Sequence, residues 1–374
     1  MWGCVLSNRT LRILGTRGVP AAHGGFETFA EYLALFLVDR GWAITVYCQQ
    51  DGKGPIHEDN WRGIHRLHIP VHQQGPLGTI VFDWRAIQHA AHNPGLTLTL
   101  GYNTAIFCAW LRLKRVPNLI NMDGIEWKRK KWGILPKAWF YLNDWAGCWL
   151  GNHLIADNPQ IKTHLISRVS GDKITMIPYG ADRVNGATPE TLQALGLEPR
   201  CYLTLIARPE PENSILEVVS GFSRKPRGVK LAVLGNYDVE GNAYHRAVKN
   251  AASEEVCFLG AIYDKTILRA LRYHCAAYIH GHQVGGTNPS LVEAIGAGNP
   301  VIAQDNLFNR WVAGPTADYF ADVDGFERVL EKTLASSEKL AQMRQGSQAR
   351  FDEAFTWEKV LADYEALLSR WLPE

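Results

Sequence analysis

The sequence predicts an α/β protein built from two doubly wound parallel sheets. Short runs rich in branched and aromatic residues alternate with amphipathic stretches along almost the whole chain. This alternation restarts after residue 182. A chain of 374 residues is also longer than those that usually fold around a single hydrophobic core. Strand–helix alternation is typical of parallel sheets with helices on both faces. We therefore expect two Rossmann-like domains facing a cleft.

The predicted strands and helices follow from apolar spacing. The stretch 27–40 is predicted to be a helix that ends before Gly41, because apolar residues recur in it at helical spacing: Phe29, Leu33, Phe36 and Leu37. The predicted strands are 11–15, 43–48, 97–100, 118–122, 153–156 and 174–177, then 202–206, 230–234, 256–259, 276–279 and 300–303. The predicted domains are an N-terminal Rossmann-like domain over 1–182, a C-terminal Rossmann-like domain over 183–355, and a helix over 356–374 that crosses back to the first domain.

Charge and tryptophan are unevenly distributed. Residues 1–182 hold 19 Lys and Arg against 13 Asp and Glu, whereas 183–374 hold 20 against 24. Ten of the thirteen tryptophans precede residue 183. An anionic, partly apolar partner of the first domain is expected.

The sequence predicts a cytoplasmic protein. Its seven cysteines, Cys4 among them, are scattered, show no metal-binding spacing and resemble small core residues of a reducing compartment. No run of about eighteen apolar residues is present, so we expect a protein that at most lies on a membrane surface.

Glycine-rich turns follow several predicted strands. In "GTRGVPAAHGGFET" (15–28), Gly24 and Gly25 precede a helix, where a close backbone and free N–H groups suit an anion. The G-x-G-x-x-G fingerprint is absent, and an ordinary turn is the alternative. In the second half, "ARPEPENS" (207–214) and "GGTNPSLVEAIGAGNPVIA" (285–303) also connect a strand to a helix.

These motifs, with "IPYGAD" (177–182), resemble the retaining glycosyltransferases of family 4, which have the two-domain GT-B fold. "MDGIEWKRKKW" (122–132), "ADNPQI" (156–161) and "GTNPSLVEA" (286–294) are similar to the branch of bacterial polysaccharide rhamnosyltransferases. The resemblance implies that the domain over 183–355 binds a nucleotide-diphosphate sugar, with dTDP-L-rhamnose as our best interpretation. It also implies that the domain over 1–182 binds the acceptor, a lipid-diphosphate-linked saccharide, and that no metal or other cofactor takes part.

The resemblance assigns donor-binding residues. Arg208 matches the arginine that grips the diphosphate, and Asn213 replaces the usual lysine. Glu293 matches the carboxylate that binds the ribose, whereas Gly285 replaces the usual first glutamate. The remaining donor-binding predictions are the glycines Gly24 and Gly25 together with Gly286, Thr287, Asn288, Pro289, Ser290 and Leu291. A cation and helix amides there would neutralise a departing diphosphate.

Three further residues are catalytic candidates. Asp157 and Tyr179 follow predicted strands and can orient the acceptor hydroxyl or bond the substrates, although Asp157 also suits a helix cap and Tyr179 a packing role. Asp123 replaces the strand-end histidine of many relatives. His280 and His282 are either donors to the phosphate or core histidines.

A basic, tryptophan-rich stretch predicts a membrane and acceptor surface. It comprises Trp127, Lys128, Arg129, Lys130, Lys131 and Trp132. Such residues favour an anionic membrane interface. We expect no nucleic acid partner, because no nucleic-acid-binding module surrounds the stretch. A solvated basic face without a partner is the other alternative for it.

For the whole chain, a nucleotide-sugar epimerase and a non-catalytic sugar-nucleotide-binding protein remain alternatives.

Overall fold

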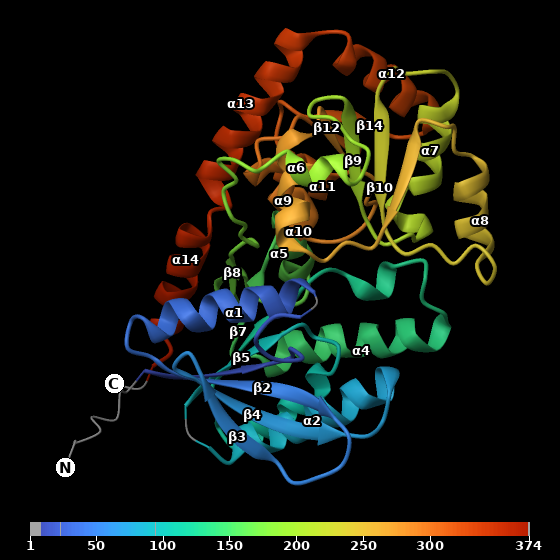
Figure 1. The fold of residues 1–374 in the computed structure, drawn as a ribbon. Helices are drawn as coiled ribbons and strands as arrows, with labels where there is room; N and C mark the ends of the chain where they lie inside the picture. Colours follow the sequence, from blue (N-terminus) through green and yellow to red (C-terminus); the bar gives the residue numbers. More distant parts are fainter. Residues whose placement is uncertain (1–8, 23, 94, 373–374) are drawn as a thin grey trace. The chain divides into compact units, whose positions relative to one another are not determined.

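The computed structural model describes residues 9–22, 24–93 and 95–372 of the chain (Figure 1). The chain divides into two compact units. The first unit contains residues up to Lys128, Trp132–Pro178 and the segment from Trp357 onward. The second unit contains Arg129–Lys131 and Tyr179–Thr356. Each unit is described by itself.

The first unit contains an eight-stranded sheet in the order β3-β4-β2-β1-β5-β6-β7-β8. All neighbouring strands are parallel except β3 and β4. The strands are β1 (Thr10–Leu14), β2 (Ala43–Asp51), β3 (His57–Trp61), β4 (Ile64–Val71), β5 (Leu96–Leu100), β6 (Asn118–Asn121), β7 (His153–Ala156) and β8 (Ile174–Met176). The sequence did not predict β3 and β4.

Helix α1 (Gly25–Val38) buries its apolar face in this unit. There Phe29, Leu33 and Leu37 are fully or almost fully buried, as their spacing predicted, whereas Phe36 is only half-buried. The α-helices are α1 (Gly25–Val38), α2 (Gly75–Ala91), α3 (Cys108–Leu113), α4 (Ile134–Leu150), α5 (Pro159–Ile166) and α14 (Trp357–Ser369), and the 3₁₀ turns are η1 (Ala105–Phe107), η2 (Glu126–Lys128) and η3 (Gly171–Lys173).

The last helix, α14, is part of the first unit although it follows the second in sequence. Its Tyr364 ring lies 4.7 Å from that of Phe29, and Trp357 stacks on Tyr32 at 4.5 Å. The buried side-chain amide of Asn121 donates to the Tyr364 hydroxyl at 2.9 Å. Aromatic packing and a buried hydrogen bond therefore fix α14 to this unit.

The second unit contains a six-stranded, fully parallel sheet in the order β11-β10-β9-β12-β13-β14. The strands are β9 (Tyr202–Ile206), β10 (Lys230–Leu234), β11 (Val256–Gly260), β12 (Ala277–His280), β13 (Val301–Gln304) and β14 (Asp318–Phe320). The short strand β14 was not predicted. Around the sheet lie η4 (Pro211–Asn213), α6 (Glu190–Gln193), α7 (Ile215–Ser223), α8 (Ala243–Asn250), α9 (Lys265–His274), α10 (Pro289–Gly296), α11 (Leu307–Ala313), α12 (Val323–Leu334) and α13 (Ser337–Ala354).

The cysteines within the described residues are free thiols, and four of them are buried. Cys201 is exposed, so the prediction of a core residue was wrong there, because it lies in the turn just before β9. Cys4 lies outside the described residues.

Among the described helices, none combines the length and hydropathy needed to cross a bilayer.

Candidate functional site

The sheet of the second unit reverses its strand order between β9 and β12. These two central strands pair in parallel, with Leu205 opposite Ile279, while β10 extends the sheet on one side and β13 on the other. Ligands of doubly wound sheets bind beyond the carboxyl ends of the strands at such a switch point. The loops that follow β9 and β12 therefore form the candidate donor site.

Hydrogen bonds tie these two loops together. The backbone N–H of Gln283 donates to the carbonyl of Glu212 at 2.9 Å. The Gln283 side-chain amide donates to Ser214 Oγ at 3.0 Å. A Cβ atom at Gly281 would lie 2.1 Å from the Asn213 carbonyl oxygen, so only glycine permits this approach. The two loops thus form one surface.

Arg208 is presented by this surface. It lies just beyond β9, and its carbonyl accepts a 2.7 Å bond from the side chain of the buried Asn213. The Arg208 side chain is exposed, and its guanidinium makes no hydrogen bond or ion pair with any described residue. The hydrogen bond from Asn213 thus fixes the backbone of Arg208, while the Arg208 guanidinium remains available to an anion.

The glycine turn before α10 offers backbone donors. Gly285 has a φ of 137°, and within the described chain the N–H groups of Gly285 and Gly286 have no acceptor. The first-turn N–H of Ser290 donates instead to Asn288 Oδ1 at 3.0 Å, and that of Leu291 to the Asn288 carbonyl at 3.1 Å. The turn, rather than the first helical amides, therefore supplies the free donors.

Other predicted donor residues have structural partners. Thr287 is buried, and Pro289 occupies the first helical position, where a missing N–H costs nothing. Glu293 forms an ion pair with the largely buried Arg272 of α9. Arg272 thus orients the carboxylate that the resemblance assigns to the ribose.

Two buried histidines lie beside this turn. The rings of His280 and His282 stack with centroids 4.3 Å apart. Neither ring nitrogen of His280 has a hydrogen-bond partner among the described residues. Burial, with the added charge of Arg208, lowers the pKa of His282 to about 3, and burial also lowers the pKa of His280. Both rings are neutral at pH 7.

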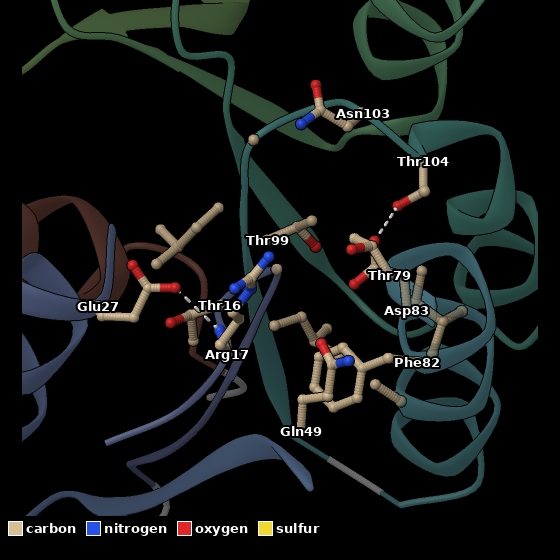
Figure 2. A pocket seen from close by; sticks show the side chains of 16 residues that line it. Thr16, Arg17, Glu27, Gln49, Thr79, Phe82, Asp83, Thr99, Asn103 and Thr104 are labelled. Atoms are coloured by element: carbon tan, nitrogen blue, oxygen red, sulfur yellow. Dashed lines mark hydrogen bonds between the residues drawn. The ribbon is translucent and has the colours of Figure 1, made fainter. Parts of the chain in front are cut away.

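A cavity of about 260 Å³ lies at the corresponding switch point of the first unit, beyond β1 and β5 and against α2 (Figure 2). The side chains of Arg17, Gln49, Thr79 and Asn103 line it and make no hydrogen bond or ion pair with a described residue. The ring of Phe82 contributes an apolar wall. Free hydroxyl, amide and guanidinium groups beside a ring suit a polyhydroxylated ligand.

Asp83 is the buried carboxyl group of this cavity, which Glu27 also lines. Its Oδ2 accepts a 2.7 Å bond from the Thr104 hydroxyl (Figure 2). Burial raises the pKa of Asp83 to about 6. Part of the cavity lining, including Arg17 and Glu27, belongs to the glycine-rich stretch 15–28 that the sequence indicated. The sequence did not indicate Asp83, because this residue lies in the middle of a helix rather than at the end of a strand.

Comparisons with known proteins agree with this architecture. A family model described as a domain of unknown function, DUF1972, matches residues 8–182. No curated protein matches the chain. Sucrose-phosphate synthase from Thermosynechococcus elongatus superposes with a TM-score of 0.79 at 17% identity, covering 97% of this chain and 98% of that one.

Two other solved structures superpose over a similar length. Anabaena HepE in complex with UDP-glucose gives a TM-score of 0.76 at 15% identity, covering 96% of this chain and 99% of that one. The UDP-forming α,α-trehalose-phosphate synthase from Burkholderia xenovorans, in complex with glucose-6-phosphate, gives 0.73 at 11%, covering 96% and 100%. The chain has the GT-B fold.

In the first GT-B domain, the predicted Gly24 lies at the start of a helix and the predicted Asp123 lies at a strand end. Gly24 has a φ of 87° and precedes α1, which begins at Gly25. A Cβ atom at Gly24 would lie 2.4 Å from the Glu27 carboxylate, whose other oxygen accepts the Arg17 N–H at 3.2 Å. Asp123, just beyond β6, has a φ of 51° and donates its N–H to Asn121 Oδ1.

Asp157 follows β7 directly and is partly buried. The next residue, Asn158, caps α5 by accepting the N–H of Gln160 at 3.0 Å. The alternative interpretation of Asp157 as the helix cap is therefore wrong, because the chain enters α5 one residue later. Tyr179 is also partly buried and begins the long segment of the second unit.

Several side chains of the basic, tryptophan-rich stretch interact with acidic residues of the protein. The indole N–H of Trp127 donates to Asp144 at 2.8 Å, and that of Trp132 to Glu126 at 3.1 Å. Arg129, which clusters with the second unit, forms an ion pair with Glu212. In the same stretch Lys128 and Lys130 are exposed, whereas Lys131 is partly buried.

Proposed function

We propose that this protein is a retaining glycosyltransferase that uses a nucleotide-diphosphate sugar. The observation that carries the proposal is the joined surface after β9 and β12, where the exposed Arg208 accompanies the free N–H groups of Gly285 and Gly286. A cation and backbone donors at one surface suit a diphosphate. The UDP and UDP-glucose complexes of Anabaena HepE, which has the same fold, support this class of ligand.

The chemistry requires positive potential at the leaving group. The bond from the sugar carbon to the diphosphate oxygen breaks, its electron pair stays on the diphosphate, and the acceptor oxygen bonds the same carbon. The acceptor proton passes to the departing phosphate. Arg208 stabilises the developing charge, and Asp157 and Tyr179 orient the acceptor. We propose that no metal takes part.

The donor sugar is proposed to be L-rhamnose, carried by dTDP. The motif resemblance supports this choice, and Gly285 in place of a glutamate fits a sugar with a different hydroxyl pattern. We propose a lipid-diphosphate-linked saccharide as the acceptor, with its sugar in the cavity beside Asp83. The enzyme would then act at the cytoplasmic face of the cell membrane in surface polysaccharide synthesis.

Incubation of the purified protein with dTDP-, UDP- and GDP-sugars and a synthetic polyprenyl-diphosphate saccharide tests the proposal. A new glycolipid that retains the donor's anomeric configuration is the expected product. An isomerised nucleotide sugar would establish an epimerase instead, and binding without any product would establish a non-catalytic protein. Loss of activity in EDTA, restored by added metal, would contradict the metal-free mechanism.

A further inference from the structure

Helix α4 presents its apolar side chains to solvent. Its seventeen residues, ILPKAWFYLNDWAGCWL, include only two charged residues, Lys137 and Asp144. Asp144 and the neighbouring Asn143 are among its buried residues. A surface helix of a soluble protein normally has the opposite arrangement.

The exposed residues form one continuous face. Ile134 is 87% exposed, Leu135 81%, Leu142 61% and Trp149 62%. Leu135, Leu142 and Trp149 are seven residues apart in turn, which places them along one line of the helix. Tyr141 is exposed as well. We call Ile134, Leu135, Tyr141, Leu142 and Trp149 the α4 face.

Polar contacts on the inner side fix this orientation. Asp144 Oδ2 accepts from Trp127 and lies 2.9 Å from nitrogens of both His164 and Arg168. Asn143 Oδ1 accepts the backbone N–H of Ile106 at 2.9 Å. Turning the apolar side inward would expose these bonds and leave buried charges unpaired, which is costly. The outward apolar face is therefore built into the unit.

The charge around the face is positive. Residues 108–115 and 134–150, which form α3 with its end and α4, contain four Lys and Arg against one acidic residue, the buried Asp144. Arg112, Lys114 and Arg115 are exposed at the end of α3, which packs against α4. A second copy of this chain would bring the same positive charge to the contact, whereas an anionic lipid surface complements it.

We propose that the α4 face docks on an anionic lipid bilayer, with α4 lying in the interface. Leu and Ile side chains enter the acyl boundary, Trp149 and Tyr141 occupy the headgroup level, and the basic residues face the lipid phosphates. This surface differs from the Trp127–Trp132 stretch, whose indoles are bonded to carboxylates. The proposal rests on the proposed function in one respect only: docking on the bilayer would bring the glycosyltransferase to its lipid-linked acceptor.

Vesicle flotation of the full chain tests the proposal. We compare phosphatidylcholine vesicles with vesicles that also contain phosphatidylglycerol. The variant Leu135→Ser/Leu142→Ser/Trp149→Ser is expected to lose at least tenfold in partition to the anionic vesicles. The matched control is Leu77→Ser/Val239→Ser/Leu307→Ser, which removes exposed apolar side chains elsewhere and should bind like the unmodified protein.

The possible outcomes separate this proposal from the enzymatic one. Thermal shifts with nucleotide sugars should be equal for both triple variants, which also shows that both are folded. Absence of donor binding in the unmodified protein, with flotation intact, would reject only the proposed function. Flotation that is equal in both triple variants, or a concentration-dependent dimer abolished by the α4 substitutions, would overturn the docking proposal.

Discussion

The side-chain amide of Asn213 donates to the main-chain carbonyl of Arg208 at 2.7 Å and closes the loop that follows β9. Asn213 is 2% exposed, and its own carbonyl packs against Gly281. Asn213, which stands where the resemblance to family 4 glycosyltransferases would place a lysine, thus faces into the protein and positions Arg208 through its backbone.

Asn213→Ala should weaken donor binding more than turnover. Loss of one buried hydrogen bond typically costs about 1 kcal/mol of stability and loosens the loop that carries Arg208. We expect a higher KM for the nucleotide sugar, with kcat changed less, measured by steady-state kinetics. Asn213→Lys should destabilise the protein further, because it buries an unpaired cation; a stable Lys variant with improved donor affinity would contradict this account.

Arg208→Ala should reduce turnover without unfolding the protein. The side chain is exposed and unbonded within the described chain, so its removal leaves packing intact. Loss of one preorganised donor to a developing anion costs about 10²–10³ in kcat. Arg208→Lys should recover part of the rate, and Lys332→Ala serves as a distant charge control. A fully active Arg208→Ala enzyme would rule out the proposed role.

Asp83 should titrate near pH 6. Because burial raises its pKa from 3.8, the folded state holds the proton more tightly than the unfolded chain. This group's contribution to stability is therefore greatest below pH 3.8 and is lost as the pH rises through 6. Carboxyl ¹³C NMR should give a midpoint near 6 that Thr104→Val moves upward, since the Thr104 hydroxyl favours the charged form. A midpoint near 4 would contradict the burial argument.

Acid should destabilise the second unit through the histidine pair. The folded pKa of His282 is about 3 against 6.5 in the unfolded chain, so the unfolded state takes up a proton first as the pH falls. Stability is complete above pH 6.5 and decreases as the pH falls from there toward 3. The variant His280→Phe keeps an aromatic ring stacked on His282 but removes a titratable imidazole. Its Tm should therefore decrease less between pH 7 and pH 5 than the Tm of the unmodified protein. An unchanged slope would assign the acid sensitivity elsewhere.

The sequence predicted the elements with strong apolar periodicity and missed those without it. Strands such as 202–206 and 230–234 were found with the observed bounds. The strand His57–Trp61 is exposed and polar, and its partner Ile64–Val71 interleaves histidine and arginine with apolar residues. The edge strand β3 and the adjacent β4 are defined by their hydrogen-bonded neighbours rather than by burial alone.

The sequence by itself determined the two doubly wound sheets and the chemical character of the loops after their central strands. Strand polarity and the switch-point rule are local and topological, so Arg208 and the start of the helix near Pro289 were predicted as neighbours at one edge of the sheet. Tertiary structure alone decided that Asn213 is buried, that Asp83 opens into a cavity, and that α4 turns its apolar side outward. The physical reason is that burial and pKa depend on the side chains that distant segments bring against a residue, which no local pattern specifies.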